Sequence, residues 1–434
     1  MHNRSAPNLL LTAVLLPWLW VFVAFCPLSA QRLISLAECR AAASEHHAFE
    51  EQMNLVKSAA AAQQIMLRKL ITPEAGGFAT ASYLSDVPRF SSSDDFGIDF
   101  RPMVRDQYRT GIYARQSLYD GGEYNSKSAL EETERQINAS KVERQQRILE
   151  NAVDELFLNS ILLGKGIQIL QVREDILQTR FRQLESLYSE GKVYRVELLE
   201  MEAALADIRA HQEALLADQE RFRHMLSALT GLVITPDDSL LLPDVQMSGT
   251  RNEDPLFRQL KLEKQKLRQT RQLSRSSAMP RLDASAVAGY ARPGLNLFSN
   301  EFDTYWIIGM TLRVPATAWR DHQRNIRALT VQESQLLIYY DNLRRQEQLL
   351  FQELNGEVIK YDRLISRDAE LIEKQTLIRK EYESMLTEGV ASASDLLQAL
   401  SAESQARISK VRHEVEMVRA SLRRDNAIIE QLKQ

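Results

Sequence analysis

A row of apolar residues spaced seven apart is the feature of this sequence that most constrains its fold. The row contains Val142, Leu149, Leu156, Leu163, Leu170, Leu177 and Leu184. Such a repeat holds one face of a helix against a neighbour and winds the pair left-handedly. It predicts a helix from about Ser126 to Tyr188, on the order of 90–100 Å long at ~1.5 Å per residue.

The predicted long helix ends at a glycine turn, and the second half of the chain repeats the arrangement. After Gly191 a second helix is expected over residues 196–229, and after Gly389 a last helix over residues 395–429. Glu197-Leu198-Leu199 in the first half corresponds to Asp395-Leu396-Leu397 in the second. The match predicts two structural repeats, residues 31–235 and 251–434, joined by a linker over 236–250. The fold class is mainly α with a small β part.

Four short segments alternate between apolar and polar residues and are predicted to be strands: residues 78–84, 108–119, 282–290 and 304–314. Their length and alternation are typical of membrane-spanning strands. Residues expected to face lipid are Ile112, Trp306, Ile308, Met310 and Leu312. Four strands cannot close a barrel and open edges are not tolerated in lipid, so closure requires several chains, about twelve strands for three. The alternative is a small soluble β-layer between helices.

The N-terminus has the pattern of an export signal. An apolar stretch over residues 9–25 precedes Cys26-Pro27-Leu28-Ser29-Ala30, which predicts a signal peptide over residues 1–30 cleaved after Ala30. Two alternatives are an uncleaved membrane anchor and a lipoprotein modified at Cys26. No later stretch of the sequence is long and apolar enough for a transmembrane helix. The net charge of −4 gives no indication of nucleic-acid binding.

No pattern of catalytic or metal-binding residues is present. The sequence contains no phosphate loop, dinucleotide fingerprint or nucleophile elbow. The seven histidines lack the spacing of metal ligands. We therefore expect no enzyme activity, no catalytic residues, no cofactor and no metal. Two other classes stay open at this point: an exported coiled-coil tether or filament, and a secreted hydrolase with a helical scaffold.

The ordered set of these features resembles the TolC-type outer-membrane efflux proteins over essentially the whole mature chain. The resemblance rests on the tandem repeat, on the two glycine turns with their sequels, and on three motifs: Pro73…Tyr83, Pro280…Tyr290 and Ser117-Leu118-Tyr119-Asp120-Gly121-Gly122. It implies a homotrimer in the outer membrane of a Gram-negative bacterium, with a twelve-stranded β-barrel continued by a long periplasmic α-barrel. A periplasmic adaptor protein would dock at the helical tip and connect the channel to an inner-membrane pump, as in efflux or type I secretion.

The resemblance also implies roles for residues at the tip. Acidic residues after the tip turns narrow the pore aperture in the family, and Asp395 matches one of them, with Glu197 its counterpart in the first half. A second family aspartate falls at Gln398, and the family's latch residues fall at Leu386 and Ala391, so the latch is absent or rebuilt. Residues expected at the adaptor contact are Gly191, Lys192, Val193, Gly389, Val390 and Ala391. A local alternative for Asp395 is a helix cap with Ser392.

Overall fold

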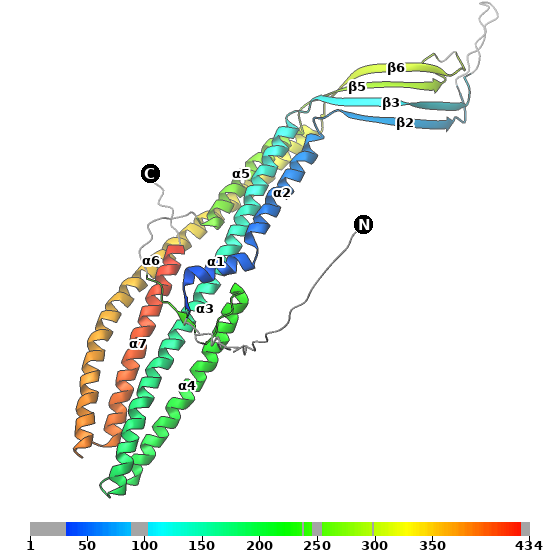
Figure 1. The fold of residues 1–434 in the computed structure, drawn as a ribbon. Helices are drawn as coiled ribbons and strands as arrows, with labels where there is room; N and C mark the ends of the chain where they lie inside the picture. The colour runs from blue at the N-terminus through cyan, green and yellow to red at the C-terminus, as the bar shows by residue number, and fades with distance from the viewer. Residues whose placement is uncertain (1–31, 88–102, 237, 245–253, 297–298, 427–434) are drawn as a thin grey trace, which may run out of the picture.

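The computed structural model describes residues 32–87, 103–236, 238–244, 254–296 and 299–426, and the predicted signal peptide lies outside them. The molecule is elongated. A sheet lies at one end and long helices extend from it. The two turns that connect helices in the two hairpins form the opposite end, which we call the tip (Figure 1).

Two helical hairpins make up most of the length. The first joins α3 (Glu123–Ser189) to α4 (Arg195–Thr230), and the second joins α6 (Ala318–Thr387) to α7 (Ala393–Asn426). With 67 residues, α3 is about 100 Å long. Its start is fixed by Asp120, whose carboxylate accepts hydrogen bonds from the backbone N–H groups of Gly122 (2.8 Å) and Tyr124 (2.7 Å). The predicted end of the last helix, residue 429, lies outside the described residues.

The heptad row of α3 is a packing seam, as its spacing predicts. Leu156, Leu170, Leu177 and Leu184 are all less than 9% exposed, because α4 lies along one side of α3 and α7 along another. A further core forms midway along the molecule, where Val153 and Phe157 of α3 meet Leu226 of α4 and Val415 of α7. The two hairpins are therefore packed together and not separate rods.

The helical spacing of apolar residues over residues 33–70 predicts a single helix, and the structure differs from this prediction. The structure has β1 (Leu33–Ile34), α1 (Leu36–His46) and α2 (Phe49–Arg68), with a break at Ala48, whose φ is 52°. The break turns α1 toward the end of α4, where a Cβ on Gly231 would lie 2.7 Å from the His46 ring. β1 pairs in parallel with β4 (Ser239–Leu240), a short strand inside the predicted linker.

Four antiparallel strands form the sheet, in the order β2-β3-β5-β6. They are β2 (Glu74–Tyr83), β3 (Asp106–Tyr119), β5 (Arg281–Arg292) and β6 (Asp303–Arg313). β2 begins four residues before the predicted strand, because glycine at position 76 leaves room for the Tyr113 ring, 2.8 Å from where a Cβ would stand. Residues 85–104 are polar and rich in turn residues, which predicts a loop, and residues 88–102 of it lie outside the described residues.

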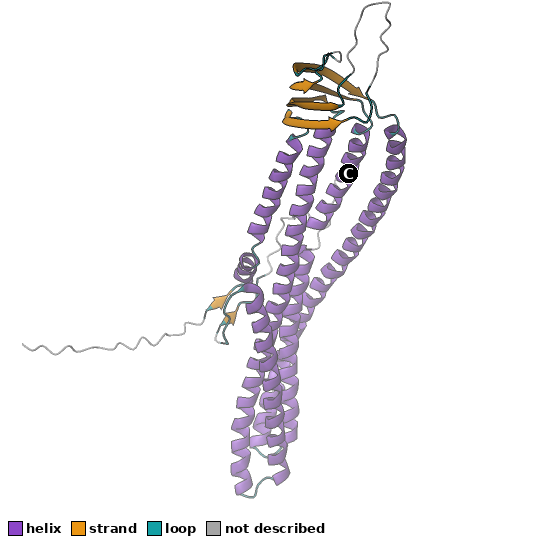
Figure 2. Ribbon diagram, turned by 90° about the vertical axis from the view of Figure 1, so that its right-hand side faces the viewer, coloured by secondary structure: helices purple, strands orange, loops and turns teal. Residues whose placement is uncertain are grey.

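The remaining helix, α5 (Pro255–Ser276), connects the linker to β5 and packs beside α3 and α6. Asp254 caps it, accepting a hydrogen bond from the backbone N–H of Leu256 at 2.6 Å. Figure 2, turned from the first view, shows the strands stacked across the upper ends of the long helices. Both ends of the molecule are thus held by helices from both halves of the sequence.

Candidate functional site

One face of the sheet is apolar from edge to edge. Opposite residues in an antiparallel sheet point to the same side, and the register aligns Gly77, Ile112, Ala288 and Trp306 in one row across the sheet. The next row along β6 consists of Ala75, Ala114, Ala286 and Ile308.

The five residues expected to face lipid all lie on this apolar face. Their exposed fractions are large: Ile112 68%, Trp306 71%, Ile308 74%, Met310 73% and Leu312 65%. Contiguous apolar surface of this kind marks a site of contact with membrane or protein.

The opposite face of the sheet is mixed. It carries Arg109, Arg115 and Thr311, together with apolar side chains such as Ile307. The Tyr113 hydroxyl on this face donates a hydrogen bond to Glu74 at 3.4 Å. Over the middle of the strands the sheet therefore separates an apolar side from a side with charged groups, as the alternation predicts, and the Asp106–Arg292 ion pair lies at the far end of the apolar side.

The sheet has two open edges. β2 pairs only with β3, and β6 pairs only with β5, so each edge strand has one unpaired row of backbone groups within the described chain. Unpaired edges in a lipid environment leave N–H and C=O groups without hydrogen bonds.

The two tip turns have the same backbone geometry. The N–H of Lys192 donates to the C=O of Leu187 (2.9 Å), and the N–H of Val390 donates to the C=O of Met385 (2.8 Å). Both turns place a glycine at positive φ, 74° at Gly191 and 76° at Gly389. This is the Schellman ending of a helix, in which the left-handed residue favours glycine. The expected adaptor-contact residues lie in or beside these turns, and Val390 is 68% exposed.

Behind the turns, the two hairpins share one core. Leu184 of α3, Met201 of α4 and Leu396 of α7 are at most 1% exposed, and Leu386 of α6 is 7% exposed. Leu386, at the position that the resemblance assigns to a latch residue, is part of this core. Leu199 does not join it and is 51% exposed.

The acidic candidates differ in their surroundings. The Asp395 carboxylate accepts hydrogen bonds from the Ser392 backbone N–H (3.0 Å) and hydroxyl (2.7 Å), while the Asp395 N–H donates to the Ser392 hydroxyl (3.2 Å). These reciprocal bonds form a capping box at the start of α7, and the Ser392 hydrogen bonds lower the pKa of Asp395. Glu197 lies in the first turn of α4 with no side-chain partner among the described residues. Gln398 is exposed on α7.

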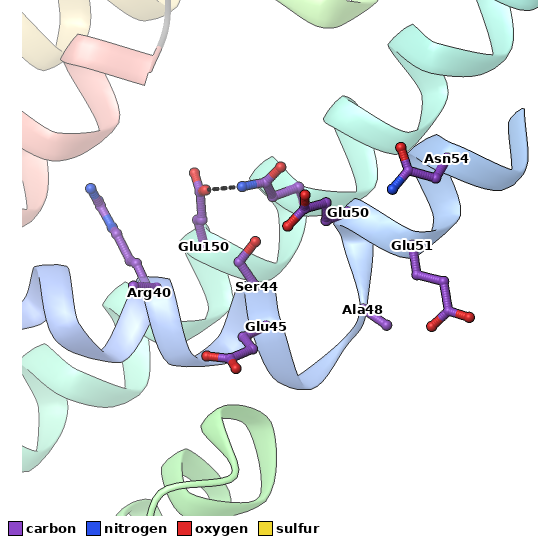
Figure 3. Close-up of a pocket in the computed structure, with 10 residues that line it drawn as sticks. Arg40, Ser44, Glu45, Ala48, Glu50, Glu51, Asn54 and Glu150 are labelled. Atoms are coloured by element: carbon purple, nitrogen blue, oxygen red, sulfur yellow. Dashed lines mark hydrogen bonds between the residues drawn. The ribbon is translucent and has the colours of Figure 1, made fainter. Parts of the chain in front are cut away.

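A pocket beside the junction of α1 and α2 is lined by several carboxylates that do not point toward a common centre. Figure 3 shows Glu45, Glu50, Glu51 and Glu150 around it, with Glu51 pointing away and Glu150 accepting a hydrogen bond from Gln146. Arg40 at its rim donates two hydrogen bonds to Asp154. Within the described ranges, no three histidine, cysteine, aspartate or glutamate side chains are placed to hold a metal ion.

None of the helices in the part of the chain that the structure describes combines the length and apolar character needed to cross a membrane.

Comparison with known proteins identifies the fold. Residues 80–232 match the model of the outer membrane efflux protein family. The solved outer membrane protein VceC from Vibrio cholerae superposes with a TM-score of 0.72 at 12% identity, covering 91% of this chain and 97% of that one. The resemblance to TolC-type outer-membrane efflux proteins is confirmed.

Two further TolC-type structures support the fold. The Neisseria gonorrhoeae MtrE outer membrane channel matches with a TM-score of 0.69 at 14% identity, covering 92% of this chain and 90% of that one. The Campylobacter jejuni CmeC outer membrane channel matches with a TM-score of 0.66 at 13% identity, covering 92% of this chain and 87% of that one. No curated protein sequence matches the chain. The predicted fold class is confirmed, and the outer-membrane location of these proteins agrees with the predicted localisation.

Proposed function

We propose that the chain is one protomer of a trimeric exit channel in the outer membrane of a Gram-negative bacterium. The channel is a passive duct of an efflux or type I secretion system, with the strands in the lipid and the helices extending into the periplasm. The single observation that carries this is the four-stranded sheet with an apolar face and two open edges, joined to helices about 100 Å long. Three copies would close about twelve strands, an ordinary barrel size.

The helices give a second reason for assembly. Most of the heptad row of α3 is buried within one chain. The sequence of α6 has a similar row of apolar residues at seven-residue spacing, and three of its members stay substantially exposed: Leu350 at 40%, Leu371 at 44% and Ile378 at 43%. Other apolar residues of α6 are more exposed, including Ile338 at 63% and Leu349 at 67%. A neighbouring protomer would cover these side chains, and each buried leucine or isoleucine contributes about 1.5–3 kcal/mol.

The purified protein is expected to be a trimer. In one chain the edge strands have unpaired backbone groups and the apolar side chains of α6 remain exposed. Native mass spectrometry in detergent measures the oligomeric state directly. A heat-denatured sample supplies the monomer mass as the control. A folded monomer in detergent would contradict the channel, and a soluble monomeric rod would favour the tether.

At the tip, we propose that Glu197 and Asp395 lie near the pore aperture, with Gln398 one turn beyond Asp395. The exposed turn residues, Lys192 and Val390 among them, would contact a periplasmic adaptor that connects the channel to an inner-membrane pump. Rings of carboxylates favour cations and oppose anions. The capping box does not compete with this role, because it leaves Asp395 exposed and ionised.

Replacing both Glu197 and Asp395 with alanine is expected to reduce the cation preference of the channel, measured as reversal potential in planar bilayers under a salt gradient. Ser392→Ala is the matched control, because it removes the two hydrogen bonds of the Ser392 hydroxyl but keeps the Asp395 carboxylate and its bond from the residue 392 backbone N–H. Selectivity should change in the double variant and stay unchanged in Ser392→Ala. If neither variant alters selectivity, Asp395 is a helix cap alone.

A further inference from the structure

A pocket between α3 and α7 is lined by more basic than acidic side chains. Neither contact with an adaptor at the tip nor the membrane strands require this excess of positive charge. The volume of the pocket is about 320 Å³, and it lies roughly halfway between the middle core and the tip. Four basic side chains line it, with one carboxylate: Lys165, Arg173, Arg379, Arg407 and Glu403. We call it the α3/α7 pocket.

Two of the four cations are already neutralised. Glu403 is 6% exposed and accepts hydrogen bonds from Arg379 (2.6 Å) and from Arg407 (2.7 and 3.0 Å). Arg379 also donates to Glu383 at 2.7 Å. These hydrogen bonds hold the side chains on the α6 and α7 side of the pocket in place. The carboxylates of Glu403 and Glu383 are already paired and do not neutralise the cations on the α3 side of the pocket.

Arg173 and Lys165, on the α3 side, have no such partners. Within the described residues, neither forms an ion pair or hydrogen bond, and the Nε of Arg173 is buried with its donor unsatisfied. Burial lowers the pKa of Arg173, opposed by a weaker influence of Asp207 on α4. A buried donor without an acceptor destabilises the folded protein, and more so when the donor is charged. The position of Arg173 therefore destabilises the folded protein unless a bound group supplies an acceptor for its Nε–H.

The rest of the lining suits a small ligand. Ser404 supplies a hydroxyl, and Ile169, Ile176 and Leu400 form apolar walls, with Val172 at the rim 60% exposed. Apolar walls lower the local dielectric and strengthen the attraction between a guanidinium and an anion. Arginine also offers several donors in a planar fork, which matches carboxylate and phosphate oxygens.

We propose that the α3/α7 pocket binds a small oxyanion, a phosphate or a carboxylate, held by Arg173 with help from Lys165 and Ser404. Such a ligand would join α3 to α7 in the wall of the helical region. The site lies outside the strands and does not depend on the proposed transport function.

The test is isothermal titration calorimetry of the purified full-length protein with inorganic phosphate, at constant ionic strength set with sodium chloride. We expect saturable binding, weakened at least tenfold by Arg173→Gln and less by Lys165→Gln, because Lys165 is exposed. Arg182→Gln is the matched control. Arg182 is an exposed arginine on α3 outside the pocket, and its replacement should leave the affinity unchanged.

Succinate, titrated in parallel, distinguishes the two oxyanion classes, and saturable binding of either one supports the site. Absence of binding by both would overturn the proposal, as would equal affinity in the parent protein and Arg173→Gln. The unfolding temperature of Arg173→Gln, measured in a thermal scan, distinguishes an anion-binding arginine from one that only packs. Without added anion, Arg173→Gln should unfold at the same temperature as the parent or higher, because an unsatisfied buried donor is removed. A lower unfolding temperature together with unchanged phosphate affinity would make Arg173 a packing residue.

Discussion

Replacing Ile308 with arginine is expected to cost roughly 2–4 kcal/mol of insertion free energy, enough to remove most of the protein from the outer membrane. Ile308 lies at the middle of β6, which spans Asp303–Arg313, and its side chain is 74% exposed on the apolar face. The middle of a spanning strand lies near the bilayer midplane, where a guanidinium loses most of its hydration. The measurement is the amount of folded protein in outer-membrane fractions.

Thr311→Arg is the matched control, three residues along the same strand. Thr311 pairs with Asp283, on the opposite face from Ile308, which pairs with Ala286. Arginine at position 311 would therefore lie on the face that already carries Arg115, and insertion should be nearly normal. If both variants insert equally well, the two faces of the sheet have been assigned wrongly.

The long helices and the tip turns could be predicted from sequence because both depend on local pattern. A seven-residue repeat requires a helix with one covered face, whatever the partner is. A glycine after a long amphipathic run predicts the left-handed ending seen at Gly191 and Gly389. The strands could be predicted for the same reason: alternation determines which side chains share a face before the pairing is known.

The differences arise where distant residues decide the backbone. Nothing in the local pattern of residues 33–70 marks Ala48 as a helix break, because that break depends on packing of α1 against the end of α4. β2 begins inside a glycine-rich stretch that locally predicts a turn, and antiparallel pairing with β3 makes it a strand, with the Tyr113 ring lying over Gly76. Leu199 follows the tip turn as Leu397 does, yet stays 51% exposed.

The candidate sites also divide into one that local sequence predicts and one that depends on packing between distant residues. The order of residues around the tip placed Asp395 in the first turn of a helix, and Ser392 three residues earlier indicated the cap that the structure contains. The α3/α7 pocket could not be predicted from sequence. It combines Arg173 with residues more than 200 positions later, and only the packing of α3 against α7 brings them together.

The network around Glu403 is expected to contribute strongly to the stability of the second hairpin. Glu403→Ala should lower the free energy of unfolding by about 2 kcal/mol, because Arg407 and Arg379 lose their hydrogen bonds to a buried carboxylate while Arg379 keeps Glu383 as a partner. This is the lower end of the usual range, since the Arg407 side chain remains 45% exposed while that of Arg379 is 13% exposed. Chemical denaturation followed by circular dichroism measures the difference. Glu381→Ala, an exposed glutamate of α6, should change the stability by less than about 0.5 kcal/mol.

The same network predicts a dependence on pH. Burial raises the pKa of Glu403, but hydrogen bonds from Arg407, Thr376 and Arg379 outweigh it and hold the pKa below its ordinary value. A carboxyl with a lower pKa in the folded state stabilises that state fully above its unfolded pKa of about 4.3. This contribution is lost as the pH falls through the lower folded value. The stability difference between the parent and Glu403→Ala should therefore be constant from pH 8 to about pH 5 and shrink below about pH 4. A difference that grows on acidification would show that Glu403 is not ionised in the folded protein.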